Sequence, residues 1–392
     1  MTPIALITTL IFGLLTAMQF ASVGVALWRL CRPDNVTKNA VPFIALVRPL
    51  CGLNSFEEAT LRSSFLLNYP CYEILFCVAS HDDPVIPLVE KMIACYPEQP
   101  ARLLIGEDRI SGNPKLNNLN KAWHDSASEW VAMADSNLLL PTDYLQQLVA
   151  AYQADTGLVS SPASGILPLN LWGSLEAAML NTYQARWQFL SDWAGAGFAQ
   201  GKTLFWRRDI LVNGGGLAAL GTELAEDVAA TKLVRRAGLR VRLSRQPFRQ
   251  PVGRRTLNEV WSRQLRWARI RRFGFLSLFI PEILMGLVPA LSAAIWLAAS
   301  GTFSWGVPPL LVFSWYAAEW GMAKVMGWPH RPRDVLAMLL RDIMLPALWV
   351  WCWTGRGFSW RGHLREAVPS AVNHAFTASE EGTGQHVRSA NP

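Results

Sequence analysis

The sequence contains few of the short motifs that mark common binding sites. Its six cysteines form no CxxC pair, so neither a zinc knuckle nor a disulfide scaffold is indicated, and reduced thiols are the simplest interpretation. Neither a P-loop nor a GxGxxG follows any strand expected below, which argues against a kinase-type NTPase and a dinucleotide dehydrogenase. Only 17% of the 392 residues are charged and 51% are hydrophobic. The chain is therefore too apolar for a disordered protein and unusually apolar for a soluble enzyme.

The N-terminal region has no charged side chain over a length that suits a membrane. Residues Ile4 to Trp28 are uncharged, and about 20 apolar residues suffice for a helix to cross a bilayer. A cleaved signal peptide is the alternative, but Met1 to Pro3 include no Lys or Arg and no cleavage pattern follows. The sequence therefore predicts an uncleaved transmembrane anchor over residues 1–31.

Three further apolar stretches form a predicted C-terminal membrane region over residues 273–355. They cover residues 275–300, 304–323 and 335–353. The last stretch contains Arg341 and Asp342 near its middle, and charges are costly in hydrocarbon, so it either crosses, re-enters or lies in the interface. We therefore expect two or three C-terminal membrane helices, followed by a polar tail over residues 356–392.

Basic residues flank these stretches on one side. They are Arg29, Arg32 and Lys38 after the first stretch, Arg269, Arg271 and Arg272 before the second, and Lys324, Arg331 and Arg333 before the last. Cytoplasmic flanks carry an excess of Lys and Arg. The pattern predicts a multi-pass protein of the inner (cell) membrane, with residues 32–272 on the cytoplasmic side.

Residues 32–272 alternate short apolar runs with segments of helical spacing, which predicts an α/β domain. A mostly parallel sheet covered on both faces is expected, and ligands bind such sheets beyond the carboxyl ends of the strands. The expected strands are 43–47, 73–78, 102–105 and 130–134, and the expected helices are 57–67, 87–95, 115–124 and 143–152.

Acidic side chains follow two of these strands. Asp82 and Asp83 come after the run that ends at Val78, and Asp135 and Asn137 come after the run that ends at residue 134. Carboxylate and amide oxygens suit hard cations, so Asp135 and Asn137 are candidate ligands for the Mg²⁺ or Mn²⁺ that a nucleotide diphosphate requires. Ordinary Asx turns are the alternative interpretation at both places.

A third acidic site, Glu226 and Asp227, lies near the start of an expected helix that runs to Arg236. Acidic residues in a first turn often complement the helix dipole. A carboxylate at this point can also accept a proton from a hydroxyl group that attacks a sugar. From the residues alone both interpretations remain open.

Arginine is concentrated just before the second membrane stretch. Residues 235–272 contain 13 Arg and one acid, Glu259. No nucleic-acid motif is present and the stretch leads directly into the membrane, so an interfacial helix over residues 256–272 on anionic headgroups explains most of the charge. Arg263, Arg266 and Trp267 share one helical face and can instead turn inward to a diphosphate.

Taken together, these motifs resemble the D, D, D, (Q/R)xxRW pattern of processive-type family 2 glycosyltransferases and their relatives. In finer detail the chain resembles the ceramide glucosyltransferases, including bacterial members, over about residues 40–275. Six motifs keep the family's order and approximate spacing: Val47–Gly52, Asn68–Pro70, His81–Pro84, Asn113–Asn118, Asp135–Asn137 and Ala225–Asp227.

The resemblance implies a GT-A fold, Rossmann-like, inserted between the membrane segments. It also implies inverting transfer of glucose from UDP-glucose to the primary hydroxyl of ceramide, with a UDP-sugar, a lipid and the bilayer as partners and no nucleic acid. One departure is that the metal motif is Asp-Ser-Asn, so the second ligand is neutral. By resemblance the base is Asp227, the metal ligands are Asp135 and Asn137, and the donor-binding residues are Asp82, Asp83, Lys115, Asn117, Asp135, Arg263, Arg266 and Trp267.

Several alternatives remain open on the sequence. The sugar can be GlcNAc, galactose or a uronic acid, and the acceptor a hopanoid or another lipid alcohol. Processive polysaccharide synthesis needs a polymer channel with more spans than this chain offers, and a non-catalytic scaffold would use only the basic helix. The segment Phe198 to Thr203 has no derived mechanism, although Gly201 permits close backbone approach to the acceptor.

Overall fold

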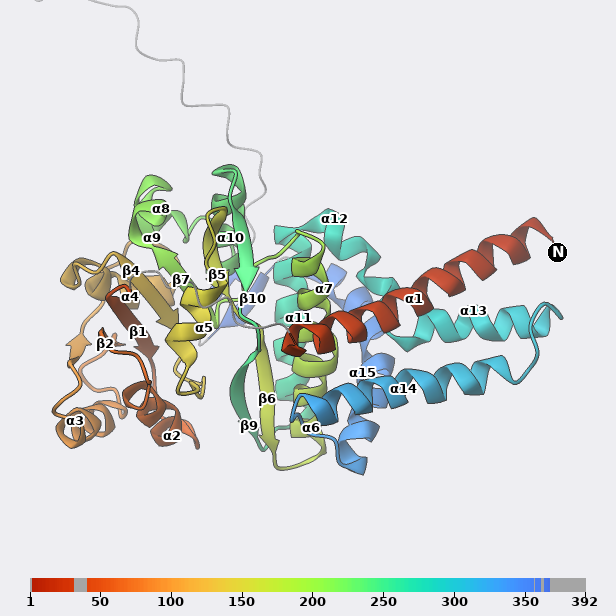
Figure 1. Cartoon of the computed structure of the whole chain (residues 1–392), viewed down its shortest axis with the longest axis horizontal. Helices are drawn as coiled ribbons and strands as arrows, with labels where there is room; N and C mark the ends of the chain where they lie inside the picture. Colours follow the sequence, from red (N-terminus) through yellow and green to blue (C-terminus); the bar gives the residue numbers. More distant parts are fainter. Residues whose placement is uncertain (1, 32–40, 356, 361–362, 367–392) are drawn as a thin grey trace, which may run out of the picture.

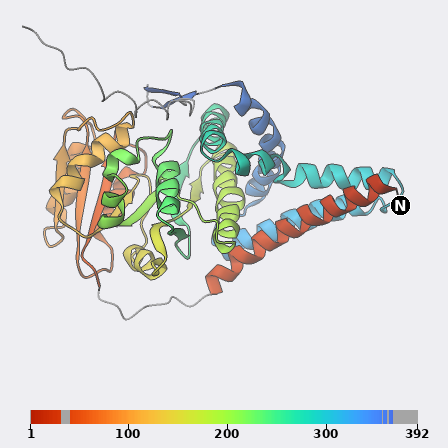
Figure 2. The ribbon, with the colours of Figure 1, turned by 90° about the horizontal axis from the view of Figure 1, so that it is seen from above.

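The computed structural model of the chain describes residues 2–31, 41–355, 357–360 and 363–366. An α/β domain lies at one end, and a group of long helices projects from the other (Figures 1 and 2). Arg32 and Lys38, two of the basic residues that predict the membrane orientation, lie outside the described residues, as does most of the predicted polar tail.

A mixed seven-stranded sheet forms the centre of the α/β domain, in the order β3-β2-β1-β4-β7-β5-β8. Strands β3, β2, β1 and β4 are parallel, whereas β7 runs antiparallel to both β4 and β5. The four expected strands are confirmed within a few residues. The bounds are β1 Ile44–Leu50, β2 Tyr72–Val78, β3 Ala101–Ile105, β4 Trp130–Ala134, β5 Thr156–Ser160, β7 Thr203–Arg207 and β8 Arg240–Leu243.

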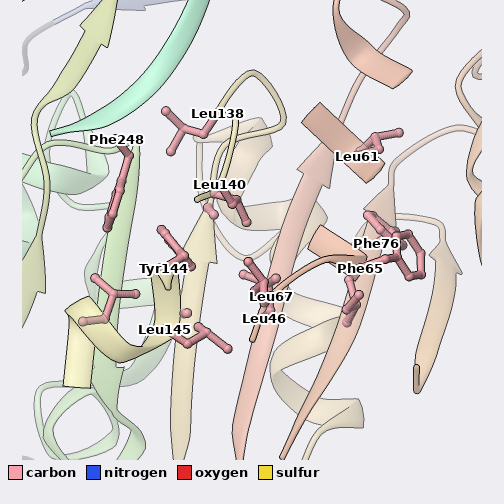
Figure 3. Packing of buried hydrophobic residues seen from close by; sticks show 14 of the residues in the cluster. Leu46, Leu61, Phe65, Leu67, Phe76, Leu138, Leu140, Tyr144, Leu145 and Phe248 are labelled. Atoms are coloured by element: carbon pink, nitrogen blue, oxygen red, sulfur yellow. The ribbon is translucent and has the colours of Figure 1, made fainter. Parts of the chain in front are cut away.

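Helices cover both faces of this sheet because successive strand residues point to opposite sides. Leu46 lies in one buried cluster with residues of α2 (Glu57–Arg62), its 3₁₀ extension η1 (Ser63–Phe65), α3 (Ile86–Cys95) and α5 (Tyr144–Ala151). Figure 3 labels Leu61 of α2, Phe65 of η1 and Tyr144 of α5 in this cluster. Val47 packs on the opposite side, whose helices are α4 (Pro114–Asp125), α8 (Arg208–Asn213), α9 (Gly216–Ala219) and α10 (Glu226–Arg236). The domain is therefore the predicted α/β sandwich.

A second layer lies between the main sheet and the projecting helices (Figure 1). It contains the parallel pair β6 (Ala163–Pro168) and β9 (Phe248–Gly253), then α6 (Leu171–Ala178), a π-helical segment η2 (Met179–Ala185) and α7 (Arg186–Trp193). The predicted basic helix is α11 (Leu257–Gly274), which begins with a capping box between Thr256 and Glu259. This layer places the basic helix between the sheet and the apolar helices.

Three helices project side by side from this layer: α1 (Pro3–Cys31), α13 (Leu287–Ala299) and α14 (Val307–Val325) (Figures 1 and 2). By length and apolar composition, α1 and the helix over Pro332–Thr354, which comprises α15 (Pro332–Trp351) and η4 (Cys352–Thr354), can cross a membrane. Helix α14 does not meet this criterion. Helix α15 runs across the base of the projecting helices beside α11 (Figure 1).

The span predicted over 275–300 is not one straight helix. It divides into α12 (Leu276–Phe279), the 3₁₀ segment η3 (Ile280–Leu284) and α13, with a bend of 47°. Pro281 is the second residue of the 3₁₀ segment, and Gly286 takes a φ of 92°, a conformation that L side chains rarely adopt. The segments Leu276–Leu284 and Leu287–Ala299 give a third candidate span only if they cross the membrane together as one bent helix.

The charged pair Arg341 and Asp342 is fully paired inside the protein. Arg341 Nη2 lies 2.9 Å from Glu319 Oε2 and 3.0 Å from Asp342 Oδ1. Gln19 of α1 donates to the same glutamate at 3.0 Å, and Arg186 of α7 lies 3.3 Å from it. Charges in an apolar helix are tolerated when they pair within the protein, so this network joins α1, α7, α14 and α15.

Candidate active site

The acidic residues predicted from the strand ends lie at one edge of the main sheet. Asp135 follows β4, and Asp82 and Asp83 follow β2, two strands away in the same parallel group. Antiparallel β7 adds a further residue at this edge, because Thr203 pairs with Ala134 and the Asp135 amide donates to the Lys202 carbonyl at 3.0 Å. The carboxyl end of β4 and the start of β7 thus converge.

Asp135 lies between two lysines. Lys115 Nζ is 2.7 Å from Asp135 Oδ1, and Lys202 Nζ is 3.1 Å from Oδ2. Burial by itself would raise the pKa of Asp135, but the two ammonium groups outweigh it and lower this pKa to about 2. The carboxylate is therefore ionised throughout the physiological range.

Lys115 connects three segments of the site. It lies in the first turn of α4, where the Asn113 side chain caps the helix by accepting from the Lys115 amide at 3.0 Å. Its Nζ also lies 2.8 Å from Glu226 Oε1 and donates to the Gly201 carbonyl at 2.6 Å. Burial opposes its charge, yet the carboxylates of Asp135 and Glu226 raise the pKa of Lys115 above its usual value.

Glu226 and Asp227 begin α10, the helix predicted to run to Arg236, and their environments differ. Glu226 is held by Lys115 and accepts from Asn113 at 3.0 Å. Among the described residues, the Asp227 carboxylate accepts from two backbone amides, that of Gly201 at 3.0 Å and that of its neighbour Val228 at 2.8 Å. Burial and the adjacent Glu226 raise the pKa of Asp227 to about 6. Asp227 is therefore the more basic carboxylate of the pair.

Asp82 and Asp83 lie apart from this group. Both oxygens of Asp83 accept from the Gly52 amide, at 3.0 and 2.9 Å, so Asp83 holds the loop after β1. Asp82 is exposed. Within the described residues, neither shares a hydrogen bond or ion pair with Asp135, and their role near a nucleoside stays a prediction.

The two predicted asparagines point in different directions. Asn137 Oδ1 accepts from Lys202 Nζ at 3.1 Å, so it faces the Asp135 group. Asn117 Oδ1 accepts from the backbone amides of Ile110 and Ser111, at 3.1 and 3.0 Å. Asn117 therefore shapes the loop before α4, and its contact with a donor stays a prediction.

The basic motif on α11 approaches the same site. Arg263 Nη1 lies 3.0 Å from Glu176 Oε1 of α6. Burial lowers the pKa of Lys202. The Asp135 carboxylate opposes this shift, and the positive charges of Arg263 and Lys115 add to it. Trp267 packs partly buried against the main core cluster, and Arg266 is half-buried on the same helix. Arg263 therefore lies near enough to Lys202 to influence its charge, while donor contacts of Arg266 and Trp267 stay predictions.

Two site residues were missing from the sequence prediction. Arg48 of β1 is fully buried and donates to the carbonyls of Asp135, Ser136 and Leu138 at 3.1, 2.9 and 3.2 Å, so it fixes the loop after β4. An arginine beside an apolar strand was the available signal. Lys202 gave no comparable signal, because only the pairing of β4 with β7 places it beside Asp135.

Asp135 and Asn137 supply oxygen atoms suited to a hard cation. In the part of the chain that the structure describes, no three His, Cys, Asp or Glu side chains gather closely enough to hold a metal ion. A cation at this place would therefore need further oxygens, such as those of a phosphate ligand.

Comparison with known proteins places this geometry in context. The model of glycosyl transferase family 21 matches residues 9–369. Ceramide glucosyltransferase 1 of Caenorhabditis elegans is 23% identical over 359 residues, which cover 85% of this chain and 76% of the relative. Ceramide glucosyltransferase of Komagataella phaffii is 35% identical over 112 residues, 28% of this chain and 22% of the relative.

A solved structure also shares the fold. It is a mannosyltransferase from Pyrobaculum calidifontis in complex with GDP-Man and Mn²⁺. The two chains align with a TM-score of 0.50 at 18% identity, over 88% of this chain and 96% of the other. At this identity the likeness concerns the fold alone, and it agrees with the predicted GT-A arrangement.

Proposed function

Because the chain belongs to glycosyl transferase family 21, we propose that it transfers glucose from UDP-glucose to the primary hydroxyl of ceramide and forms glucosylceramide. The names of its relatives support this choice of donor and acceptor. The apolar helices beside the α/β domain support a lipid acceptor, because helices of this length and composition can cross a bilayer and would hold the domain beside it. Another UDP-sugar, or a hopanoid or other lipid alcohol, is the alternative.

One observation carries the proposal: two consecutive residues connect the candidate base to the candidate diphosphate site. The Gly201 amide donates to Asp227 at 3.0 Å, and the next residue, Lys202, contacts Asp135 at 3.1 Å. A sugar bound between these carboxylates would have its leaving group near the lysines and its other face toward Asp227. This is the arrangement that direct displacement requires.

The proposed reaction proceeds in one displacement. Asp227 accepts the proton of the lipid hydroxyl as its oxygen forms a bond to the anomeric carbon. The bond from that carbon to the phosphate oxygen breaks, and its electron pair leaves with UDP. Lys115 and Arg263 provide positive charge where the leaving group gains negative charge. Attack from the side opposite the leaving group inverts the anomeric centre and gives a β-linked product.

We further propose a divalent cation, Mg²⁺ or Mn²⁺, held by Asp135 and Asn137. One carboxylate and one amide oxygen leave most coordination positions for the oxygens of a diphosphate and water, as Mg²⁺ sites commonly do. Such a cation would neutralise charge on the departing diphosphate. The bound Mn²⁺ of the mannosyltransferase neighbour supports this proposal.

For the cellular location we propose the inner (cell) membrane, with the catalytic domain on the cytoplasmic side. The arginines that flank the apolar helices support this orientation. Arg29, at the end of α1, pairs with Asp192 of α7 and donates to the carbonyls of Leu243 and Ser244. The end of α1 thus contacts both α7 of the second layer and the end of β8 in the main sheet.

Labelled donors test this function. Membranes with the expressed protein are incubated with isotopically labelled UDP-glucose, UDP-galactose, UDP-GlcNAc or UDP-glucuronic acid, together with ceramide or a hopanoid, and lipid extracts are analysed by mass spectrometry. We expect labelled hexosylceramide from UDP-glucose. A label confined to a non-sphingoid lipid, or a product polymer longer than a disaccharide, would refute the assignment.

The acid–base balance of Asp227 predicts a pH profile. Because its pKa is raised to about 6, the carboxylate is protonated below this pH and cannot accept a proton. We expect kcat to fall about tenfold per pH unit below about pH 6 and to level off above about pH 7. UDP binding, measured by calorimetry over the same range, should stay nearly constant. A kcat that is level from pH 5 to 7 would contradict this role for Asp227.

Gly201 offers a test of the tight packing around the carboxylates. A Cβ atom added at residue 201 would lie 2.6 Å from Glu226 Oε1 and 3.6 Å from Lys115 Nζ. Displacement of these groups by about 1 Å should lower the transfer rate of Gly201→Ala about 100-fold. The control is Gly112→Ala, where nothing lies within 4 Å of the added atom. Equal rates for the two variants would show that the close contact is unimportant.

A further inference from the structure

Lys202 occupies the space between the two proposed cation ligands. Its Nζ lies 3.1 Å from Asp135 Oδ2 and 3.1 Å from Asn137 Oδ1. A Mg²⁺ ion bound to both oxygens would lie about 2.1 Å from each of them. An ammonium group and a divalent cation therefore cannot both occupy this position.

The backbone fixes Lys202 at this place. Residue 203 pairs with residue 134 across the β4–β7 ladder, and the Lys202 carbonyl accepts from the Asp135 amide at 3.0 Å. The Lys202 side chain is only 16% exposed. Its ammonium group can leave Asp135 by rotation of its four side-chain bonds, while its Cα atom remains beside the site.

Positive charge at this place exceeds what Asp135 can neutralise. Asp135 is shared by two ammonium groups, those of Lys115 and Lys202. Lys115 has Glu226 as a second carboxylate partner, and Arg263 has Glu176. Lys202 is the member of the group whose only carboxylate in the described contacts is the shared one. It is therefore the cation most available to an incoming diphosphate.

We propose that Lys202 is a donor-binding residue that competes with the divalent cation for Asp135 and Asn137, and that its ammonium group turns onto the donor diphosphate when the cation binds. This inference rests on the nucleotide-sugar donor of the proposed function but not on the lipid acceptor. The Gly201–Lys202 segment then has two functions. The Gly201 amide orients Asp227, and the Lys202 side chain changes its partner when a cation binds at the diphosphate site.

The test uses the full-length protein in detergent and two binding measurements on Lys202→Met. In the first, Mn²⁺ is titrated without nucleotide and followed by electron paramagnetic resonance. Loss of the competing ammonium should tighten Mn²⁺ binding about tenfold, because a positive charge no longer has to be displaced from Asp135. In the second, UDP is titrated at saturating Mn²⁺, and its affinity should fall about tenfold or more because a charge-assisted hydrogen bond is lost.

Two further variants keep the test decisive. Lys202→Arg retains the charge and should restore Mn²⁺ affinity close to that of the wild type. Lys232→Met removes a lysine of α10 that pairs with Glu223 and should change neither affinity. A purely structural Lys202 would lower the melting temperature of Lys202→Met without tightening Mn²⁺ binding, which would overturn the proposal. Unchanged UDP affinity, or no Mn²⁺ binding to either protein, would also overturn it.

These measurements separate the inference from the proposed function. If wild-type protein glucosylates ceramide but Mn²⁺ affinity does not respond to Lys202, only the inference fails. If Mn²⁺ and UDP respond as expected but no ceramide product forms, only the acceptor assignment fails.

Discussion

Asp227→Asn is expected to lower kcat for glucose transfer about 1,000-fold while UDP affinity stays within about twofold. A positioned general base typically contributes 10²- to 10⁴-fold, and the amide cannot accept the hydroxyl proton. The asparagine oxygen can still accept one of the two backbone hydrogen bonds from Gly201 and Val228. Stability should therefore fall by only about 1 kcal/mol. Transfer rates, calorimetry with UDP and melting in detergent measure the three quantities.

Asp209 provides a matched control for this variant. It is the second residue of α8, as Asp227 is the second residue of α10, and it likewise accepts from the following amide at 2.8 Å. Asp209→Asn removes an equivalent first-turn charge away from the site and should leave kcat unchanged. If Asp227→Asn kept more than about a tenth of the wild-type kcat, Asp227 would not be the base.

Lys115→Met is expected to abolish transfer and also to destabilise the domain. The variant leaves Asp135 and Glu226 without their shared ammonium group, in a place where the side chains are 25% and 14% exposed. Loss of one partner from a buried ion pair costs about 3–5 kcal/mol. We expect a melting temperature several degrees lower and UDP binding weakened about tenfold or more, measured by thermal melting and calorimetry.

The stability lost in Lys115→Met should be smaller at low pH than at neutral pH. The pKa of Asp135 is lowered to about 2 in the folded protein, from a usual value of 3.8, so its ion pairs contribute stability above about pH 4 that is lost as the pH falls toward 2. The gap in stability between wild type and Lys115→Met should therefore narrow below about pH 4. Lys91→Met changes an exposed lysine of α3 and should show no such gap. A pH-independent gap would mean that Lys115 acts through packing alone.

Local patterns were sufficient to predict half of the sheet and several helices. The parallel strands β1, β2, β3 and β4 appear as short apolar runs, and α10 has acids in its first turn and arginines in its last. The antiparallel pairing of β7 could not be predicted, because it depends on contacts between segments about seventy residues apart. The break at Gly286 was missed because the mostly apolar composition of residues 275–300 favoured one continuous span, although Pro281, Glu282 and Gly286 interrupt it.

The same distinction holds for the site. The placement of Asp135 at a strand end and of Asp227 in the first turn of a helix could be predicted, because both patterns are visible in the sequence. Lys202 could not, since its position follows from the long-range pairing of β4 with β7. That Gly201 permits close backbone approach to the acceptor stays a prediction; in the structure, a Cβ atom added at this position would meet Glu226. Arg341, predicted to be costly in hydrocarbon, is accommodated because Glu319 and Asp342 neutralise it from inside the protein.

The configuration of the product's anomeric carbon tests the account most directly. The full-length protein, purified in nanodiscs, is supplied with UDP-glucose and ceramide, and the glycolipid is examined by proton NMR. Single displacement with Asp227 as base predicts a β-glucoside, with a large coupling between the sugar protons H1 and H2. An α-glucoside, with its small coupling, would show retention and would contradict the proposed roles of Asp227 and the lysine-lined diphosphate site.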